Sequence, residues 1–512
     1  MFCPTAFYSV AEIRDIEHSA LATLPAFTLM QRAGRAASDL AGKILGEHPG
    51  EHRVLALAGP GNNGGDALET AANLAYANFD VTVLMFADID KLSSDAKHAH
   101  LHALQAGVKF IDAADAAAVL TSGPWNLIID GLFGIGLTRA ITPPLHDIVD
   151  LLNSLNCHVL ALDVPSGLNA DTGIIVGDHG IAVRASHTIT FIGNKPGLHT
   201  GDGRDYAGKV SVADLNIESQ YFIPAHAHLV TPNSFANALR KRPHNSHKGS
   251  YGDVILAGGA HGMSGAVILA ATAAAKCGAG RVFAAFLEDP PAYDPLHPEL
   301  MCRLAKDLAL AKSTVVVGPG LGTSASAHDL VLKVLNTDGP IVIDADALNL
   351  IAADQDLQQQ LAKRKAPALL TPHPLEAARL LASTSAQVQL DRLAAARSLA
   401  RRLNAVVILK GSGSIIARPD GEIAINTTGN PALATAGSGD VLSGICGALM
   451  AQHWETWHAA LGATWLHGHA ADELVTQGIG PIGLTASELI SVARAVLNRL
   501  TEHRSLGELS LF

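Results

Sequence analysis

The sequence predicts an α/β protein with two consecutive units, each built on a parallel sheet that helices cover on both faces. Short apolar strand-like runs alternate with helix-like runs along most of the chain, which is the pattern of repeated βαβ units. The alternation lapses at Phe222–Pro232, where Pro and His cluster without periodicity. The 512 residues also exceed what one hydrophobic core normally serves. We therefore expect one domain over residues 1–222 and a second over residues 223–512.

The expected strands are β-branched or Leu-rich runs that end near a Gly, Pro or Asp turn. In the first unit they are Val54–Ala58, Val81–Phe86, Leu127–Asp130 and His158–Asp163. Alanine-rich segments with helical spacing lie between several of them, at Ala67–Ala77 and His146–Leu155. In the second unit the strands are Asp253–Ala257, Arg281–Ala285, Thr314–Val317, Ile341–Asp344, Ala368–Leu370 and Val406–Lys410. The apolar run Ala266–Ala275 is too short to cross a bilayer, so we expect a core helix there.

Composition narrows the class of function. The chain is 48% hydrophobic and 16% charged, which fits a compact enzyme rather than a disordered protein. Its net charge of −11 and the lack of a Lys/Arg-dense stripe argue against nucleic acid as a partner, and we expect no membrane partner. The five cysteines form no CxxC pair, so neither a disulfide framework nor a zinc site is indicated. The N-terminal segment does not have the pattern of a signal peptide, and we expect a cytoplasmic protein.

Two motifs combine glycine with a carboxylate at the start of an expected helix. The first is the loop Gly59–Asp66, GPGNNGGD, which follows a strand. The second is Gly437–Asp440, GSGD, at the head of an apolar helix. Backbone N–H groups at a helix start can hold a phosphate, and the glycines let it approach closely. The alternatives are a tight turn without a ligand at the first motif and a capped helix start at the second.

Two more carboxylates follow expected strands of the first unit. Asp130 ends the run Leu127–Asp130, and Asp163 ends His158–Asp163. The carboxyl ends of parallel strands form the ligand crevice of doubly wound sheets. A single Asp after a strand is often only a helix cap, but Asp66, Asp130 and Asp163 together favour a site. In the second unit, Asp440 is placed to accept a proton from an attacking hydroxyl.

The motifs GPGNNGGD, DGLFGIGL and DVPSG resemble, in this order and spacing, the NAD(P)HX epimerase family. Tyr8–Arg14 and Leu29–Gly34 resemble the opening helices of that family. The resemblance implies a Rossmann-like three-layer sandwich that acts on NADH or NADPH hydrated at C6 of the nicotinamide ring. It implies Asp163 as the acid/base residue and a potassium ion held by Asn63, Asp130 and Ser166, whose oxygens suit a hard cation. The implied substrate-binding residues are Asn62, Asn63, Gly64, Gly65, Asp66, Gly134, Ile135, Gly136, Leu137, Thr138, Arg139, Ala140 and Asp163.

The second half resembles the ADP-dependent NAD(P)HX dehydratase family. The motifs are His247–Gly252, Gly258–Ala266, Gly318–Gly322, Asp344–Asn349, Thr371–Glu376, Lys410–Ser414 and Gly429–Gly444. The resemblance implies a ribokinase-like α/β domain that uses ADP with Mg²⁺ and has Asp440 as its catalytic base. The hydrate site would include Ala266, Gly322, His373 and Asp440. The nucleotide would bind at Lys410, Gly411, Ser412, Gly413, Ser414 and Gly439.

Five positions depart from the usual residues of these two families. Ala67 stands where glycine is common, while Gly131 and Ile135 replace Ala and Thr. In the second half, Leu375 replaces a glycine and Ser414 replaces a threonine. Ser414 keeps a hydroxyl that can donate to phosphate.

The two resemblances together imply a fused repair enzyme: the first half would epimerise R- and S-NAD(P)HX, and the second would dehydrate the S form to NAD(P)H at the expense of ADP, giving AMP and phosphate. We expect a homo-oligomer with NADHX, NADPHX and ADP as ligands. One alternative is an ordinary kinase of the ribokinase type, which would use ATP and leave a stable phosphorylated product. The other is a non-catalytic binding or dimerisation module in the first half. His98 and His102 share a helix face, but no third ligand favours a metal there.

Overall fold

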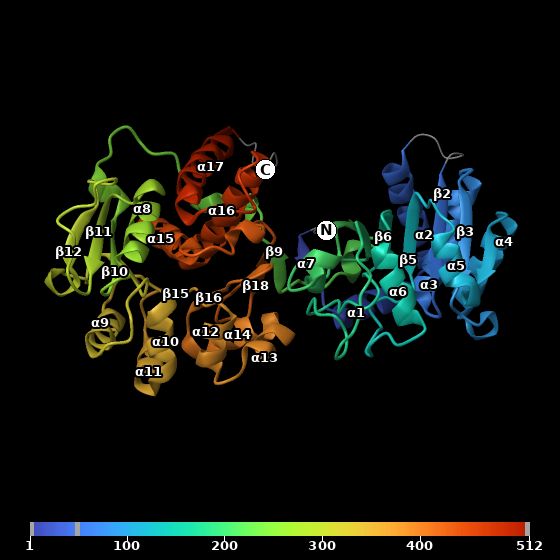
Figure 1. Cartoon of the computed structure of the whole chain (residues 1–512), viewed down its shortest axis with the longest axis horizontal. Helices are drawn as coiled ribbons and strands as arrows, with labels where there is room; N and C mark the ends of the chain where they lie inside the picture. The colour runs from blue at the N-terminus through green and yellow to red at the C-terminus, as the bar shows by residue number, and fades with distance from the viewer. Residues whose placement is uncertain (1–4, 47–51, 507–512) are drawn as a thin grey trace. The chain divides into compact units, whose positions relative to one another are not determined.

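The computed structural model describes residues 5–46 and 52–506. The chain divides into two compact units, Met1–Ala227 (unit 1) and His228–Phe512 (unit 2). The division lies within the Pro- and His-rich stretch Phe222–Pro232, five residues after the expected end of the first domain at residue 222. Each unit is an α/β structure with a sheet between layers of helices (Figure 1).

Unit 1 alternates strands and helices as expected. Its elements are β1 (Ala6–Phe7), α1 (Val10–Leu21), α2 (Thr28–Leu45), β2 (Arg53–Ala58), α3 (Asn62–Tyr76), β3 (Asp80–Met85), α4 (Ser94–Gln105), β4 (Lys109–Asp112), α5 (Ala116–Thr121), β5 (Leu127–Gly131), α6 (Leu145–Ser154), β6 (His158–Leu162), β7 (His187–Phe191), α7 (Gly203–Tyr206) and β8 (Lys209–Ala213).

The main sheet of unit 1 has the strand order β4-β3-β2-β5-β6-β7-β8, and its neighbouring strands pair in parallel. The order reverses between β2 and β5, which defines a doubly wound sheet with its ligand crevice at that point. Alternate strand residues pack on α1 to α4 at one face and on α5 and α6 at the other. The Rossmann-like three-layer sandwich expected for the first half is thus confirmed.

Strand register brings the predicted site residues of unit 1 to one edge. Ala58, at the end of β2, pairs with Gly131 at the end of β5, and Asp130 pairs with Ala161 on β6. Asp163 directly follows β6. The glycine-rich loop and the carboxylates of Asp130 and Asp163 therefore lie at the carboxyl edge of neighbouring strands, beside the switch point.

Unit 2 also alternates strands and helices. Its elements are β9 (Ala227–Leu229), β10 (Asp253–Gly258), α8 (Ser264–Lys276), β11 (Arg281–Phe286), β12 (Met301–Leu304), β13 (Thr314–Val317), α9 (Ala325–Leu335), β14 (Ile341–Ile343), α10 (Ala345–Ala353), α11 (Gln355–Lys363), β15 (Ala368–Leu370), α12 (Pro374–Leu381), α13 (Ser385–Leu390), α14 (Arg392–Leu403), β16 (Val406–Leu409), β17 (Ser414–Ala417), β18 (Ile423–Asn426), α15 (Ser438–Ala451), α16 (Thr456–Thr476) and α17 (Ala486–Leu506).

Within unit 2 the strand order of the sheet is β9-β18-β17-β16-β15-β14-β13-β10-β11-β12. The strands from β16 to β12 pair in parallel, and β17 and β18 add an antiparallel hairpin. One face packs on α8, α15, α16 and α17 in a large apolar core. Helices α9 to α14 cover the other face (Figure 1). This is the α/β class predicted for the ribokinase-like half.

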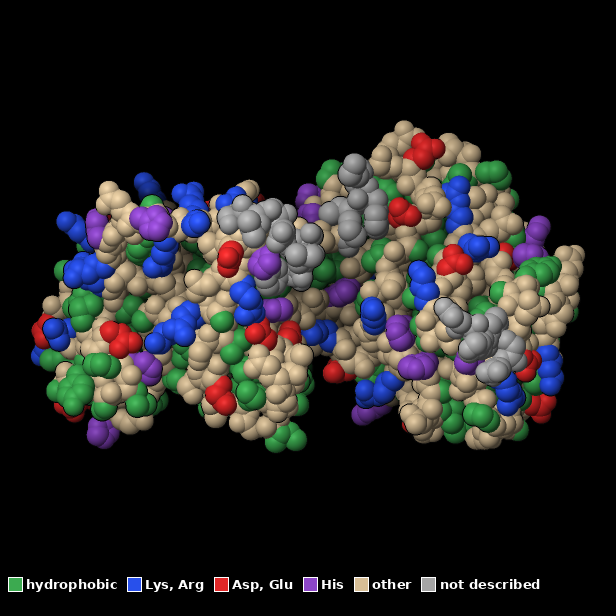
Figure 2. All heavy atoms as spheres, turned by 90° about the horizontal axis from the view of Figure 1, so that it is seen from above, with side chains coloured by type: hydrophobic (Ala, Val, Ile, Leu, Met, Phe, Trp, Pro, Cys, Tyr) green, Lys and Arg blue, Asp and Glu red, His purple; other side chains and the backbone are tan. Residues whose placement is uncertain are grey.

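Each strand expected from the sequence occurs, with bounds that differ by at most one residue. The run Ala266–Ala275 lies in α8, as expected for a core helix. None of the described helices is long and apolar enough to span a membrane. Lys/Arg and Asp/Glu side chains are interspersed on the face drawn in Figure 2. Four cysteines (Cys157, Cys277, Cys302 and Cys446) are free thiols; Cys3 lies outside the described residues.

Candidate active sites

The glycine-rich loop of unit 1 joins β2 to α3 and lies tightly against neighbouring segments. A Cβ on Gly59 would collide with the carbonyl of Leu132, and one on Gly64 would collide with the carbonyl of Gly59. A Cβ on Gly65 would collide with the Met30 side chain. The glycines are therefore required for close packing of the chain. The same packing leaves Gly64 and Gly65 buried in the first turn of α3.

A cavity of about 660 Å³ lies at this edge of the sheet. Of the thirteen residues expected to contact the epimerase substrate, ten line it: Asn62, Asn63, Asp66, Gly134, Ile135, Gly136, Leu137, Thr138, Arg139 and Asp163. Gly64, Gly65 and Ala140 are outside this lining set. Helix α1 adds Arg14 and Glu17 to the wall. The motif Tyr8–Arg14 includes Arg14, but neither residue was assigned to the site from the sequence.

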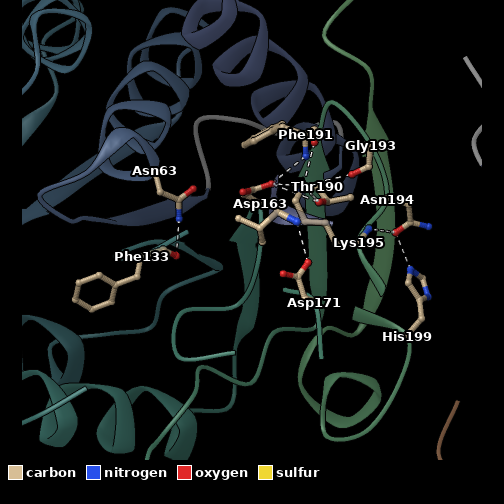
Figure 3. A network of polar contacts seen from close by, with 11 residues as sticks. Asn63, Phe133, Asp163, Asp171, Thr190, Phe191, Gly193, Asn194, Lys195 and His199 are labelled. Atoms are coloured by element: carbon tan, nitrogen blue, oxygen red, sulfur yellow. Dashed lines mark hydrogen bonds and ion pairs between the residues drawn. The ribbon is translucent and has the colours of Figure 1, made fainter. Parts of the chain in front are cut away.

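The three residues expected to hold potassium lie around the backbone of Phe133. The Asn63 amide donates to the Phe133 carbonyl over 2.9 Å (Figure 3). Ser166 Oγ lies 3.1 Å from the same carbonyl, accepts from the Phe133 N–H and donates to Asp130 Oδ1 over 2.6 Å. The Asn63 Oδ1 is buried and has no hydrogen-bond partner. A buried oxygen without a donor is the kind of atom that a cation satisfies.

Asp163 lies at the base of the cavity in a left-handed backbone conformation, with φ of 63°. Its Oδ1 lies 2.7 Å from the Nζ of Lys195, a side chain with no solvent exposure. The N–H of Phe191 also donates to Oδ1, over 3.2 Å. Lys195 did not appear in any sequence motif that we used. An isolated lysine carries no pattern, although it follows the β-branched run of β7 closely.

Several carboxyl groups share the epimerase cavity. Burial, followed by the nearby charges of Asp163, Glu17 and Glu69, raises the pKa of Asp66 well above its usual value. Burial and the Asp163 charge likewise raise the pKa of Glu17. Burial raises the pKa of Asp130 to about 6, against the hydrogen bonds from Ser166 that lower it. Such crowded carboxyl groups make the cavity suited to proton transfer.

Two of the departures from the epimerase family lie against each other. A Cβ on Gly131 would lie 2.5 Å from the Cβ of Ala67, at the contact between β5 and α3. The resemblance leads to the opposite arrangement, with glycine at 67 and alanine at 131. The methyl group is therefore on α3 here instead of on β5, and the two changes compensate each other sterically.

In unit 2, the GSGD motif begins α15 as expected. Gly437 has a φ of 86° immediately before the helix, and Asp440 lies in its first turn. A Cβ on Gly439 would lie 3.4 Å from Lys410 Nζ and 3.9 Å from Asp344 Oδ2. The Lys410 ammonium lies 2.9 Å from Asp344 Oδ1. The predicted catalytic base, the predicted nucleotide-binding lysine and the helix start are thus gathered at one place.

The surroundings of Asp440 bring its pKa close to neutral pH. Burial and the Asp344 charge raise the Asp440 pKa to about 7, while Lys410 opposes this shift. Burial also raises the pKa of Glu376 to about 7, again against Lys410. Lys410 itself loses solvation, but Asp344 and Glu376 outweigh that loss and raise its pKa. A base with a pKa near 7 can both accept and release a proton at physiological pH.

His373 has a structural use at the start of α12. Its Nδ1 accepts from the N–H groups of Leu375 and Glu376 over 3.1 and 3.3 Å. The Glu376 carboxylate in turn accepts from the His373 N–H over 2.8 Å. This reciprocal cap leaves the ring half-exposed, and its pKa is lowered by burial and then by Lys410. Leu375, the departure from glycine, points its exposed side chain outward.

The remaining expected hydrate residues lie near the β10–α8 and β13–α9 loops. A Cβ on Gly320 would lie 3.2 Å from the Ala266 Cβ, and one on Gly322 would lie 3.7 Å from the Met263 Cε. The Gly322 N–H donates to Asp346 Oδ2 over 2.8 Å. Asp346 also contributes to the raised pKa of Asp440. The interaction places these loops within electrostatic range of the Asp440 carboxyl group.

The expected nucleotide loop rests on a buried arginine that sequence reasoning missed. The Arg392 guanidinium donates to the carbonyls of Lys410 and Gly413 over 3.3 and 3.5 Å, and burial lowers its pKa to about 10. A Cβ on Gly411 would lie 2.7 Å from that guanidinium. Ser414 Oγ donates to the Gly411 carbonyl over 3.2 Å. Arg392 therefore holds the backbone of the loop Lys410–Ser414 in place.

Other residues, to which we assigned no functional role, make contacts of a different kind. His98 stacks on Phe27 at 4.2 Å, and His102 hydrogen-bonds Glu69 over 2.9 Å. Within the described ranges, no three His, Cys, Asp or Glu side chains are grouped to hold a metal ion. Asp344 precedes α10, but its side chain makes no capping bond to that helix. Its contact with Lys410 takes the place of the cap.

Comparison with known proteins agrees with this division. A family model described as NAD(P)H-hydrate dehydratase matches residues 254–493, and one described as YjeF-related protein N-terminus matches residues 26–197. The bifunctional NAD(P)H-hydrate repair enzyme Nnr of Coxiella burnetii is 37% identical over 96% of this chain and 100% of its own length. The Escherichia coli protein of the same name is 35% identical over 93% and 90%.

Among solved structures, the ADP/ATP-dependent NAD(P)H-hydrate dehydratase from Bacillus subtilis, co-crystallised with ATP and Mg²⁺, is 31% identical to this chain. It covers 53% of this chain and 98% of its own, with a TM-score of 0.47.

Two α/β units, each with a carboxylate beside a glycine-rich helix start, define a two-site enzyme. The chain belongs to the family of bifunctional NAD(P)H-hydrate repair enzymes, with full-length relatives at 37% and 35% identity. It carries an NAD(P)HX epimerase and an NAD(P)HX dehydratase. The family membership expected from the sequence is confirmed, and it favours the repair enzyme over both alternatives.

Proposed function

We propose that the two reactions use separate sites, with Asp163 as the acid/base residue of an epimerase domain over residues 1–222 and Asp440 as the base of a dehydratase domain over residues 223–512. The observation that carries the proposal is that both carboxylates have a lysine ammonium within reach. Asp163 contacts Lys195 at 2.7 Å, and Lys410 lowers the pKa of Asp440 against the effect of burial. Opposite charges of this kind control the protonation of catalytic groups.

In the epimerase, the Asp163 carboxylate takes the proton of the C6 hydroxyl of NAD(P)HX. The C6–N1 bond then opens, rotation exposes the other face of C6, and the ring closes with return of the proton. Asn62, Asp66 and the segment Gly134–Arg139 bind the substrate in the cavity. The hydrate is held by local donors such as Arg139 and the start of α3, since the chain as a whole is acidic.

We also propose a potassium ion beside this cavity. Asn63, Asp130 and Ser166 would hold it, and the unpartnered Asn63 Oδ1 is the observation that fits. A hard monovalent cation there would supply positive charge to the phosphates of the substrate and would fix the loop after β5. Oxygen is the only donor type in this set, which agrees with that choice.

In the dehydratase, Asp440 accepts the proton of the C6 hydroxyl of the S-hydrate. The hydroxyl oxygen attacks the β-phosphate of ADP at the same time, and AMP leaves. The new phosphate ester at C6 is then expelled by the electron pair of the ring nitrogen. Loss of the C5 proton gives NAD(P)H. The N–H groups at the start of α15 stabilise charge on the transferring group. Ala266, Gly322 and His373 bind the hydrate, while Lys410–Ser414 and Gly439 bind the nucleotide. Mg²⁺ enters with the phosphates.

The proposal is tested by absorbance at 340 nm on a mixture of R- and S-NADHX with ADP, Mg²⁺ and K⁺. The full chain should convert the mixture completely to NADH. With Asp163→Asn, NADH formation should stop once the S-NADHX is consumed, apart from spontaneous epimerisation. Asp440→Asn should form no NADH, but chromatography should show that it still equilibrates the two epimers. Full conversion by Asp163→Asn would exclude its role. Consumption of ATP with a stable phosphorylated product would instead indicate a kinase.

We also propose a cellular location and an oligomeric state. Free cysteines on both units fit a reducing compartment, which supports a cytoplasmic location. A homo-oligomer is proposed as well, and light scattering on the purified chain decides it: a mass of one chain would exclude it.

A further inference from the structure

Lys195 is a buried ammonium that belongs to the site of Asp163. Its side chain has no solvent exposure, and it follows β7 in a loop that no motif indicated. We propose that Lys195 is a positioning residue of the epimerase, which fixes the Asp163 carboxylate through a direct ion pair and directs its free oxygen to the substrate without transferring a proton itself. This inference rests on the proposed role of Asp163.

The ammonium has a full set of oxygen partners. Beside Asp163 Oδ1 at 2.7 Å, it donates to the hydroxyl of Thr190 over 2.7 Å and to the carbonyls of Phe191 and Gly193 over 3.0 and 3.3 Å. Figure 3 shows these partners around the Nζ. An ammonium has three N–H groups, so these four acceptors occupy all of them. Lys195 is therefore bound to the protein and has no N–H left for the substrate.

The contacts of Asp163 divide its two oxygens. Lys195, the Phe191 N–H and the Thr190 hydroxyl all contact Oδ1, at 2.7, 3.2 and 3.4 Å. Within the described residues, Oδ2 accepts no hydrogen bond, and the side chain keeps 13% of its exposure on the wall of the cavity. One oxygen is thus held by the protein and the other is left to take a proton. A fixed carboxylate with one free oxygen is what a general base requires.

The loop that carries Lys195 is itself anchored. Ile192 has a φ of 67°, a conformation that non-glycine residues adopt only when the surroundings impose it. The Asn194 side chain accepts from the Lys195 N–H over 3.0 Å and from His199 Nε2 over 2.8 Å. Burial lowers the pKa of His199 to about 4, so its ring stays neutral. The lysine is therefore held in place before substrate arrives.

The charges around Asp163 explain why a cation is needed. Glu17 on α1 and Asp66 on α3 both interact unfavourably with its charge; Arg14 acts on Glu17 with the opposite sign, and Glu69 adds a further negative charge beside Asp66. Lys195 is the ammonium in direct contact with the carboxylate. Without it, the carboxylate would face these two acidic neighbours with no positive charge in direct contact.

Stability alone does not account for this lysine. A buried ion pair is often no more stabilising than apolar side chains of the same volume, because both charges lose their hydration. Methionine would fill a similar space among the strands. We therefore attribute the charge to control of Asp163.

The test compares Lys195→Met with the unchanged chain in the full-length protein. R-NADHX is incubated with K⁺ and without ADP, and the initial rate of S-NADHX formation is followed by chromatography from pH 5 to 9. We expect kcat/KM to fall about 100-fold, as for a misplaced catalytic group, and the acid limb of the pH profile to move to higher pH. Unchanged activity, or a loss with an unchanged profile, would overturn the inference.

Three comparisons separate positioning from folding. Lys209→Met removes an exposed lysine of β8 and should leave rate and profile unchanged. Thr190→Val removes the hydroxyl between Lys195 and Asp163 at nearly constant volume and should move the profile in the same direction by less. If Lys195→Met does not fold by circular dichroism, Thr190→Val decides alone. Loss of activity in Asp163→Asn with full activity in Lys195→Met would reject only this inference; full activity in both would reject the role of Asp163.

Discussion

The two candidate sites pair a carboxylate with a lysine in different ways. In unit 1 the fully buried Lys195 contacts Asp163 directly at 2.7 Å. In unit 2 Lys410 instead contacts Asp344 at 2.9 Å and lies 4.0 Å from Glu376, so it is shared among acidic groups. Asp440 is left with a pKa of about 7. The same two residue types thus form a fixed ion pair at one site and leave a carboxyl group with a pKa of about 7 at the other.

This difference fits the two reactions. An epimerase returns the proton that it takes, so its carboxylate needs a fixed position more than a tuned affinity. The dehydratase base must take a proton from an alcohol while phosphate is transferred and must then release it to solvent. The following predictions test this contrast, from the largest effect to the smallest.

Asp440→Asn removes the base while it keeps the size of the side chain. We expect dehydratase kcat to fall by about 10² to 10⁴-fold, the usual contribution of a general base. Epimerase activity should stay within twofold of the original, about the scatter expected for a distant site. NADH formation from pure S-NADHX at 340 nm gives the first quantity and chromatography of the epimers the second. Equal loss of both activities would mean that the sites are not separate.

The pH dependence of the dehydratase should report the raised pKa of Asp440. The base must be ionised, so kcat/KM is expected to rise about tenfold per pH unit below pH 7 and to level off above it. Below that pKa the protonated form dominates, and the activity falls as the pH falls. Rates with S-NADHX at low concentration from pH 5 to 9 measure this. A flat profile across pH 7 would contradict the assigned base.

Asn63→Ala removes the unpartnered oxygen beside Phe133. We expect the epimerase to lose its stimulation by K⁺, with a loss of about tenfold in rate, of the order seen when a metal site is weakened. The gain in Tm of the ligand-free chain between 0 and 100 mM KCl, relative to choline chloride, should vanish in the variant by mass action. Asn78→Ala on the surface is the matched control. A preserved Tm gain would place the cation elsewhere.

We expect the smallest effect from the contact between Ala67 on α3 and Gly131 on β5. Gly131→Ala alone should destabilise unit 1 by about 1–3 kcal/mol, because the new methyl group meets Ala67 at 2.5 Å. Adding Ala67→Gly should return part of that loss. Part of it should remain, since the Asn63 carbonyl also lies 2.8 Å from the new Cβ. Denaturant unfolding of the two single variants and the double variant measures the coupling; strict additivity would show that the methyl groups do not interact.

The strands and motifs were predictable because their signals are local. Apolar β-branched runs located Val54–Ala58 and Thr314–Val317, and the glycine-rich loops located the starts of α3 and α15. The strands β7 and β8 were missed, since the polar and glycine-rich segments around them interrupt the alternation. Lys195 follows β7 and so lies in the region that was not predicted. Its complete burial is what distinguishes Lys195 from the other lysines that the structure describes, and burial of a single lysine has no sequence pattern.

The glycines of the first loop have a packing use that the sequence did not indicate. The resemblance assigns Gly64 and Gly65 to substrate binding, which stays a prediction, and the structure adds that a Cβ on either would collide with Gly59 or Met30. Arg392, which supports the nucleotide loop, lies on α14, far from any motif. In each case the missing information is a contact between segments distant in sequence, which periodicity and spacing do not contain.

The close approach of Gly59 to the Leu132 carbonyl has a practical consequence for redesign. The two loops line the same cavity and meet backbone to backbone, so a side chain at position 59 requires the loop after β5 to move. An effort to change which hydrate the epimerase accepts should therefore exchange both loops together.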